Sequence, residues 1–306
     1  MVRALRKVIM RAIVATPGST APRVITTDIP TAGPGEVLIR VHASVVNPVD
    51  AWVLTDSGRD AFRLSGQFGI GWDLAGTVAT PAEGLAEGTP VAATFTALGS
   101  PTAAHAEYAV VPRTAVAVIP EGVTMPAAAT VALNALTARQ ALDALGAPGG
   151  RRLLVTGAAG AVGGYALALA VADGWHVTGL ARESDREFVT SQGAEFTSDA
   201  GKQAFDAVLD AAGLAETILP ATVDNGAYLS LLPPFPVTGE RGINVDAILV
   251  RGDGEALASL LERTAGGELP VRIAQVHDLT NDVSAETAWR QTVGSGRRGR
   301  QVATWV

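Results

Sequence analysis

The sequence predicts an α/β protein of two domains, one of them β-rich and the other built on a doubly wound parallel sheet. Its 306 residues are enough for two domains of ordinary size. Hydrophobic residues make up 48% of the chain and charged residues 17%, so each domain can bury a core, and wholesale disorder is excluded. Strand-like runs fill the first third of the chain, whereas strands alternate with helices in the middle.

The β-rich texture extends from residue 1 to about residue 118. Its strand-like runs are VITTDIP, EVLIRVHASVV, GWDLAGTVAT, GTPVAATF and AEYAVVP. In EVLIRVHASVV the apolar residues fall mainly at alternate positions, from Val37 to Val45, which is the period of a strand with one buried face. This pattern predicts a half-buried strand.

A helical pattern begins at Met125, where an alanine- and leucine-rich run starts with a proline and stops at GAPGG. Strand RRLLVTG, a helix over about 162–172, strand WHVTGLA, a helix over about 184–191, and strands FDAVLDAAG and AYLSLL follow. Strands that are apolar on both faces and alternate with helices indicate a parallel sheet covered by helices. From about Asn244 we expect one more strand, helix EALASLLERTAGG, strand VRIAQV, helix ETAWRQTVGSG and strand RQVATWV.

Composition excludes several classes of function. The chain has no cysteine, so it has no disulfide, no thiolate nucleophile and no cysteine-bound metal. A net charge of -7 opposes the basic face on which nucleic-acid binding depends. The longest aliphatic stretch, Ala166–Ala172, is far shorter than the roughly 20 residues that cross a bilayer, so we expect no membrane partner. Arg11 interrupts the N-terminal apolar run and no cleavage site follows, so we expect a mature, cytoplasmic protein.

A glycine-rich turn follows the strand that ends near Thr156. Gly157, Gly160 and Gly163 have the spacing GxxGxxG, and the helix begins at Ala161 and Val162. A turn without side chains lets a dinucleotide pyrophosphate approach the N–H groups at the start of the helix. Close packing of helix on strand would also explain the glycines. The complete strand, turn, helix and strand favours dinucleotide binding.

The end of the second strand bears on which dinucleotide is bound. An NAD-binding unit carries an acid there, but this chain has Ala181 followed by Arg182. A guanidinium matches the 2′-phosphate of NADP, so we predict NADPH as the cofactor. Two alternatives remain open: Glu183 binds a ribose, or Arg182 is a solvated charge at the start of a helix.

A series of motifs matches one known family in order and spacing over nearly the whole chain. They are Pro34–Val41, Asn47–Asp50, Gly71–Val78, Ala106–Tyr108, Ala135–Ala138, Gly157–Gly163, Asp206–Asp210 and Gly296–Val302. With them the sequence resembles the zinc-independent quinone oxidoreductase branch of the medium-chain dehydrogenase/reductase superfamily. The resemblance implies a GroES-like catalytic domain from residues 1–118 and 246–306, a Rossmann domain that binds NADP from residues 119–245, and a homodimer.

The same resemblance bears on a catalytic metal. In the zinc-dependent branch a cysteine and a Gly-His-Glu motif hold the metal. This chain has no cysteine and carries Gly71-Trp72-Asp73 at the motif. We therefore expect no metal. The four histidines have no metal-ligand spacing, and we expect structural or surface roles for them.

The resemblance also implies a set of site residues. Asn47 and Asp50 would lie beside the nicotinamide, with Trp52 where the family often has a tyrosine; Asn47 would otherwise only stabilise an Asn-Pro turn. Thr137 would approach the nicotinamide ribose or bond its own helix backbone. Further candidates follow the carboxyl ends of parallel strands, where ligands bind: Asp210, which would otherwise cap the next turn, Leu231 and Leu232. Tyr108 is a weaker candidate for a proton donor, because its motif resembles a structural segment of the family.

Hydride transfer without a metal suits a quinone or an α,β-unsaturated carbonyl, whose conjugation delocalises the negative charge that develops. The sequence therefore predicts an NADPH-dependent quinone or enone reductase with a small-molecule substrate. Two alternatives remain. One is a non-catalytic NADPH-binding protein with a sensing or structural role, and the other is an enoyl reductase whose substrate is carried by another protein.

Overall fold

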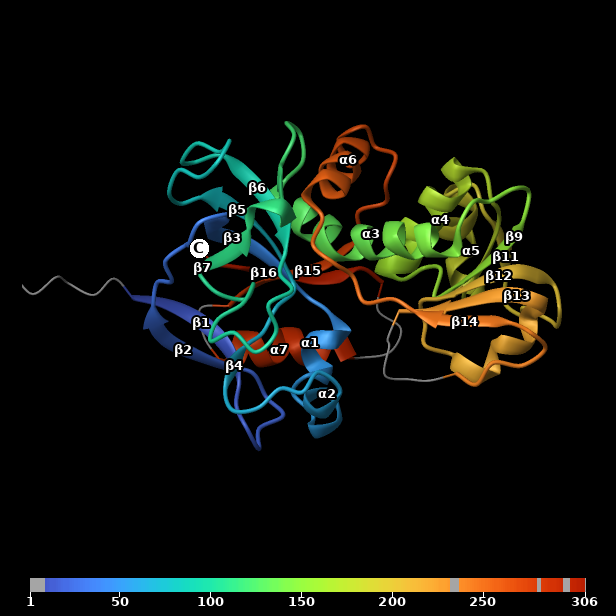
Figure 1. Cartoon of the computed structure of the whole chain (residues 1–306), viewed down its shortest axis with the longest axis horizontal. Coiled ribbons are helices and arrows are strands. Elements are labelled where there is room, and N and C mark those ends of the chain that lie inside the picture. Colours follow the sequence, from blue (N-terminus) through green and yellow to red (C-terminus); the bar gives the residue numbers. More distant parts are fainter. Residues whose placement is uncertain (1–8, 232–236, 280–281, 294–297, 306) are drawn as a thin grey trace, which may run out of the picture. The chain divides into compact units, whose positions relative to one another are not determined.

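The computed structural model describes residues 9–231, 237–279, 282–293 and 298–305 (Figure 1). The chain divides into two compact units. Unit 1 comprises Met1–Leu133, Arg251–Ala265 and Arg272–Val306, and unit 2 comprises Asn134–Val250 and Gly266–Val271. Unit 1 therefore combines segments from both ends of the sequence. The domain boundaries at residues 118 and 245 stay predictions.

Unit 1 contains two sheets in which most neighbouring strands are antiparallel. The larger has the strand order β15-β16-β3-β5-β6-β8, with β7 also paired to β3, and the smaller has the order β2-β1-β4. The strands are β1 Ile9–Ala15, β2 Arg23–Asp28, β3 Glu36–Val46, β4 Phe68–Gly69, β5 Asp73–Val78, β6 Pro90–Thr94, β7 Tyr108–Pro112, β8 Val116–Val118, β15 Ile273–Asp278 and β16 Arg300–Thr304.

Strand β3 is central to the larger sheet, and its burial corrects the sequence-based expectation. The prediction of one buried face is wrong, because nearly every residue from Val37 to Val46 is buried except Arg40. The pairing of β3 with β5 shifts by one residue between Val41 and Ala43. An extra residue reverses the alternation of a strand, so that Val46, rather than Val45, joins the main core of the unit.

The C-terminal strand brings distant parts of the sequence together. Strand β16 pairs antiparallel with the end of β3, with Gln301 opposite Val46. Parallel to β16 on its other side runs β15. The segment that follows β3, which begins at Asn47, is therefore anchored between elements that are far apart in the chain.

Unit 2 confirms the predicted doubly wound sheet. Its six strands are all parallel, in the order β11-β10-β9-β12-β13-β14. From β9 the chain adds strands outward on one side, to β10 and β11, and then on the other side, from β12 to β14. Ligands of such sheets bind outside the carboxyl ends of the strands at the point where the two sides meet, here between β9 and β12. The strands are β9 Arg152–Thr156, β10 His176–Leu180, β11 Glu195–Thr197, β12 Phe205–Asp210, β13 Thr222–Ser230 and β14 Asn244–Ala247.

The predicted helices form where local propensity favours them. Helix α3 is rich in alanine and leucine, which have high helix propensity, and Pro126 lies in its first turn. In α6 the residues Leu257, Leu260 and Leu261 recur at helical spacing and are buried. The helices are α1 Pro48–Trp52, α2 Asp56–Ala61, α3 Met125–Leu145, α4 Ala161–Asp173, α5 Arg186–Ser191, α6 Gly254–Ala265 and α7 Asp282–Val293, and the 3-10 helices are η1 Arg113–Ala115, η2 Glu183–Asp185, η3 Ala215–Thr217 and η4 Leu219–Ala221.

Several elements differ from the sequence analysis. Strands β1, β4, β8 and β11 and helices α1 and α2 are not among the predicted elements. Arg11 interrupts the apolar run of β1, and its guanidinium pairs with Glu107 at 2.7 Å in the structure. Strand β13 ends at Ser230, two residues before the predicted end at Leu232, so that Leu231 follows the strand. Leu232, the end of the predicted helix at 294–296, the first residues of the motif at 296–302, and Val306 lie outside the described residues.

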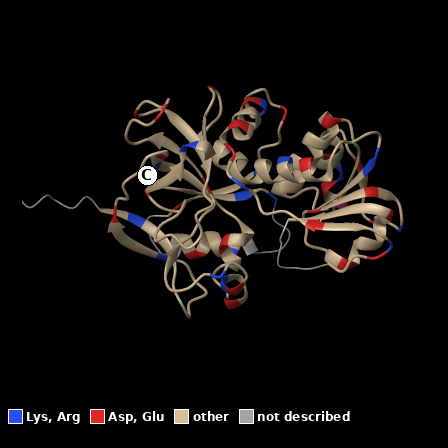
Figure 2. Ribbon diagram, viewed as in Figure 1, with Lys and Arg blue, Asp and Glu red and all other residues tan. Residues whose placement is uncertain are grey.

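Figure 2 shows Lys and Arg interspersed with Asp and Glu on the elements of each unit. In the described part of the chain, no helix combines the length and the hydropathy needed to cross a bilayer.

Candidate functional site

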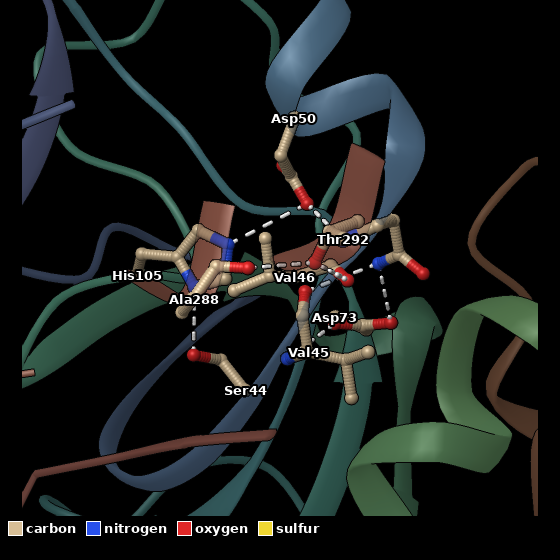
Figure 3. Close-up of polar contacts among 9 residues, drawn as sticks. Ser44, Val45, Val46, Asp50, Asp73, His105, Ala288 and Thr292 are labelled. Atoms are coloured by element: carbon tan, nitrogen blue, oxygen red, sulfur yellow. Dashed lines mark hydrogen bonds and ion pairs between the residues drawn. The ribbon is translucent and has the colours of Figure 1, made fainter. Parts of the chain in front are cut away.

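A buried polar network in unit 1 surrounds the end of β3 and the start of α1 (Figure 3). The carboxylate of Asp73, at the start of β5, accepts hydrogen bonds from the Val45 backbone N–H at 2.9 Å and from the Asn47 side-chain amide at 3.1 Å. The same amide nitrogen donates to the Val45 carbonyl at 3.1 Å. Asp73 therefore fastens the turn that leaves β3 to the neighbouring strand.

Asp50 supplies the second connection of this turn. Its Oδ2 accepts the Asn47 backbone N–H at 2.7 Å, the reciprocal bond that caps the first turn of α1. The same oxygen lies 3.5 Å from Nε2 of His105. The other ring nitrogen of His105 shares a hydrogen with the Ser44 hydroxyl at 2.7 Å. Ser44, Asp50 and His105 are all fully buried.

The electrostatics of the network centre on Asp73. Complete burial raises the pKa of its carboxyl well above the usual 3.8, and the nearby Asp50 charge raises that pKa further. The hydrogen bonds from Asn47 and Val45 and the positive charge of Arg300 oppose this shift. Two carboxyl groups thus lie close together in one buried site, and Asp73 keeps its proton to a higher pH than an exposed aspartate does.

Asp73 is expected to make stability fall as the pH rises. A carboxyl whose folded pKa exceeds its unfolded value binds more protons in the folded state, so its contribution is fully present below pH 3.8 and is lost as the pH rises through the folded pKa. Asp73→Asn removes this titration and keeps an acceptor for the Val45 N–H. Urea unfolding of both proteins across this pH range should give a variant whose stability relative to the wild type increases with pH; a constant difference contradicts the assignment.

The structure brings together two of the three predicted catalytic residues, Asn47 and Asp50, and buries both. Asn47 is 2% exposed and Asp50 is fully buried, whereas Trp52 is half-exposed. The donor bonds of the Asn47 side chain go to the protein itself. Direct contact of these residues with a nicotinamide or an acceptor stays a prediction.

An aromatic row adjoins Trp52. Its ring meets the ring of Phe62 edge to face at 5.5 Å between centroids, and Phe62 meets Trp72 at 5.7 Å. Trp72 occupies the position at which the resembled zinc enzymes carry a metal-binding histidine, and it is buried. The row therefore ends in a half-exposed aromatic surface of Trp52 and Phe62.

In unit 2 the glycine turn has the geometry that a phosphate cradle requires. Gly157 has a φ of +56°, a conformation that favours glycine. A Cβ on Gly163 would overlap the carbonyl oxygen of Gly157 and stand 2.8 Å from its carbonyl carbon. Gly160 caps α4 without a side-chain hydrogen bond, so the N–H groups of Ala161 and Val162 remain available at the start of the helix. These residues fit a dinucleotide pyrophosphate.

Arg182 follows β10 on the surface of unit 2. Within the described chain, no hydrogen bond or ion pair holds its exposed guanidinium. Glu183 instead forms two bonds with Arg186, at 2.6 and 2.9 Å, and the guanidinium of Arg186 lies over the Phe196 ring at 4.1 Å. The hydrogen bond from Arg186 lowers the pKa of the Glu183 carboxyl. Glu183 is thus occupied by a neighbour, and Arg182 is available for an anion.

Asp210 is a structural hub at the end of β12. Its carboxylate accepts bonds from Thr156 Oγ1 at 2.5 Å, Tyr228 Oη at 2.7 Å and the Ala215 N–H at 2.8 Å. Burial, followed by the bond to Asp210, raises the pKa of the Tyr228 phenol. Asp210 thereby connects the carboxyl ends of β9, β12 and β13 and fixes the edge on which the glycine turn is built.

For the remaining candidate cofactor residues, Thr137 and Leu231, the structure gives burial and position in the fold. Thr137 is nearly buried within α3, and Leu231 is half-buried after β13. Both belong to unit 2. Their contacts with a cofactor stay predictions, as does any role of the half-buried Tyr108 in unit 1.

Sequence reasoning missed three members of the unit 1 network: Ser44, Asp73 as a polar partner, and His105. Ser44 and His105 are 61 positions apart. Neither belongs to a spaced motif, so no local pattern indicated that they meet. The only signal was chemical, namely a histidine and an aspartate within otherwise apolar runs.

Comparisons with known proteins agree with this architecture. Residues 33–121 match the alcohol dehydrogenase GroES-like domain family. The chloroplast envelope quinone oxidoreductase homolog of Arabidopsis thaliana is 28% identical, over 89% of this chain and 90% of that protein. The quinone oxidoreductase from Coxiella burnetii superposes with a TM-score of 0.84 at 22% identity, over 98% of this chain and 100% of that one. The predicted fold class, a GroES-like domain with a Rossmann domain, is confirmed.

The match to a second relative covers a smaller part of that relative's length. The 2-methylene-furan-3-one reductase of Solanum lycopersicum is 28% identical over 76% of this chain, and the match covers 62% of the tomato protein. The chain thus spans less than two thirds of that relative.

Proposed function

Because the chain belongs to the medium-chain dehydrogenase/reductase superfamily, we propose that it is an NADPH-dependent oxidoreductase that reduces a quinone or an α,β-unsaturated carbonyl without a metal. The observation that carries this proposal is the glycine turn of unit 2 together with Arg182 beyond the next strand, whose guanidinium has no partner in the described part of the chain. The names of a quinone oxidoreductase homolog and of a 2-methylene-furan-3-one reductase among the relatives support the acceptor class.

The residues of unit 2 account for cofactor binding. The N–H groups of Ala161 and Val162 would donate to the pyrophosphate, while Gly157 and Gly163 keep the turn free of side chains. Arg182 would pair with the 2′-phosphate. When bound, the reduced nicotinamide supplies the hydride.

Metal independence rests on the residues where the zinc-dependent branch holds its metal. The chain has no cysteine, and buried Trp72 replaces the histidine of that branch. The carboxylate of Asp73 is committed to Val45 and Asn47. These residues do not fit a zinc site.

The acceptor half of the proposal rests on unit 1. Trp52 and Phe62 expose an aromatic surface on which a planar acceptor would stack, while Asn47 and Asp50 hold the turn that carries Trp52. An indole N–H donates a hydrogen bond but does not release its proton in the physiological range. The proton that completes the reduction therefore comes from water or from a group other than Trp52.

Steady-state turnover tests the proposed function. The purified protein is expected to oxidise NADPH in the presence of a simple quinone or an enone, and to continue in the presence of a chelator without stoichiometric zinc. NADPH binding without turnover would instead support a sensing or structural protein. Activity confined to thioester-linked enoyl substrates would select a carrier-dependent enoyl reductase. The expected homodimer and cytoplasmic location stay predictions, and light scattering would test the former.

Arg182→Ala is expected to weaken NADPH binding by about tenfold, because a charge-assisted pair with the 2′-phosphate is lost. The affinity for NADH, which lacks that phosphate, should change little. Isothermal titration with both cofactors measures the two effects.

Arg152→Ala is the matched control for this variant. Arg152 is also an exposed arginine of unit 2, but it begins β9 at the opposite edge of the sheet and pairs with Asp206. Its removal changes the net charge equally and should leave both affinities unchanged. Equal losses for NADPH and NADH in Arg182→Ala would assign Arg182 a structural role.

A further inference from the structure

His105 is a buried histidine that the proposed chemistry does not use. Its ring lies between the Ser44 hydroxyl on β3 and the Asp50 carboxylate on α1 (Figure 3). Within the described chain, its Nε2 and the Oδ1 of Asp50 have no hydrogen-bond partner. Buried polar atoms without a hydrogen-bond partner are uncommon, and each one lowers the stability of the fold, so these two atoms call for an explanation.

The surroundings of His105 hold its ring in one place. Its backbone N–H donates to the Ile70 carbonyl at 3.0 Å, and its carbonyl accepts the Ile13 N–H at 2.8 Å. The ring of Trp289 on α7 packs against it edge to face at 4.9 Å. A Cβ on Gly71 would stand 2.7 Å from its Cδ2. The imidazole is therefore clamped from several elements.

Ser44 determines how this clamped ring meets Asp50. When the Ser44 hydroxyl donates to Nδ1, the ring carries its hydrogen on Nε2, which is the nitrogen 3.5 Å from Asp50 Oδ2. The ring then directs a donor at a carboxylate that already accepts the Asn47 N–H. A short movement of the Asp50 side chain would complete the hydrogen bond.

Asp50 matters because α1 is only five residues long. So short a helix is not stable by itself and depends on its caps and its packing. The Asp50 carboxylate forms one such cap, and two residues later the chain reaches Trp52, which forms the half-exposed aromatic surface together with Phe62. Whatever holds Asp50 therefore holds the segment from Asn47 to Trp52.

We propose that His105, oriented by Ser44, is a positioning residue that holds Asp50 and thereby the Asn47–Trp52 segment in the geometry used for acceptor reduction. The role in reduction rests on the proposed function. The orientation of the ring does not, because it is a property of the folded chain and can be measured without substrate.

Nuclear magnetic resonance of histidine labelled with ¹⁵N tests the orientation. We expect the His105 ring, assigned by its absence from His105→Gln, to carry a slowly exchanging hydrogen on Nε2. Ser44→Ala should remove the preference for this tautomer. A ring without a hydrogen on Nε2 overturns the proposal.

Kinetics of three variants test the positioning. His105→Gln keeps a donor within reach of Asp50, His105→Asn reaches only Ser44, and His105→Phe keeps the packing against Trp289 but removes both nitrogens. We expect His105→Asn and His105→Phe to lower kcat/KM for the acceptor by about tenfold, since small misplacements have effects of this size or larger. His105→Gln should restore most of the loss, and the KM for NADPH should be unchanged in all three.

His277→Phe serves as the matched control. His277 is also a buried histidine of unit 1, but its Nε2 bonds Gln301 at 2.7 Å, and no carboxylate among the described residues pairs with it. This variant should keep the wild-type kcat/KM. Equal kinetics in His105→Gln and His105→Phe, or an equal loss in His277→Phe, would reduce His105 to a packing residue and overturn the proposal. Wild-type protein that turns over neither acceptor would defeat the proposed function, while the tautomer measurement would still decide the role of the ring.

Discussion

Gly163→Ala is expected to lower the affinity for NADPH at least tenfold. The added methyl group would overlap the Gly157 carbonyl oxygen and lie 2.8 and 2.9 Å from Gly157 C and Ala158 Cα, all backbone atoms that no side-chain rotation can move. The start of α4 must therefore shift away from the turn, which displaces the N–H groups that would hold the pyrophosphate. Overpacking of this kind also destabilises a fold by about 1–3 kcal/mol. Titration with NADPH and urea unfolding measure the two effects.

Gly164→Ala separates the cradle from general crowding of α4. The adjacent glycine lies in the same helix, but a Cβ there would approach Phe188 Cζ at 3.0 Å, the far end of a side chain that can rotate. We expect NADPH affinity close to that of the wild type. Wild-type affinity in Gly163→Ala, or an equal loss in Gly164→Ala, would remove the glycine turn from the cofactor site.

Gly71→Ala should destabilise unit 1 by about 2–6 kcal/mol, or prevent its folding. Gly71 has a φ of +113°, where an alanine is strained by about 1–3 kcal/mol. Its Cβ would also stand 2.5 Å from His105 N and 2.7 Å from His105 Cδ2, and overpacking adds about 1–3 kcal/mol. Urea unfolding gives the difference in stability, and soluble yield gives it if the variant does not fold.

Gly18→Ala separates the two causes. Gly18 belongs to the same unit and has a φ of +73°, but nothing lies within 4 Å of a Cβ there. Its substitution should reduce stability by only about 1–2 kcal/mol, the cost of the left-handed backbone alone. Similar losses in the two variants would show that the contact with His105 is not tight, and would weaken the view of a clamped imidazole.

Features encoded by residues close together in the chain were predictable from the sequence, whereas features set by strand pairing were not. The glycine turn and the strand, helix and strand around it were predicted from about 30 consecutive residues, because a βαβ unit is encoded by local periodicity. The half-buried pattern of β3 failed for a related reason. A one-residue shift in pairing between Val41 and Ala43 reverses the alternation, and the sequence carries no separate sign of such a bulge.

The candidate site divides in the same way. Asn47, Asp50 and Trp52 were identified as a motif because they lie within six consecutive positions, and their capping bond is local. Their partners were not identified. Asp73 lies 26 positions from Asn47, and His105 lies 61 positions from Ser44. Nothing in the intervening sequence indicates these distances.

The sequence by itself determined the fold class, the glycine turn and the absence of cysteine chemistry, because each depends on residue type or on neighbours along the chain. Only the tertiary structure decided that Arg182 has no side-chain partner among the described residues while Glu183 pairs with Arg186, and that His105 lies against Asp50. The physical reason is that hydrogen bonds and desolvation act between groups that are close in space. Strand pairing, which joins β16 to β3 and β3 to β5, sets those distances.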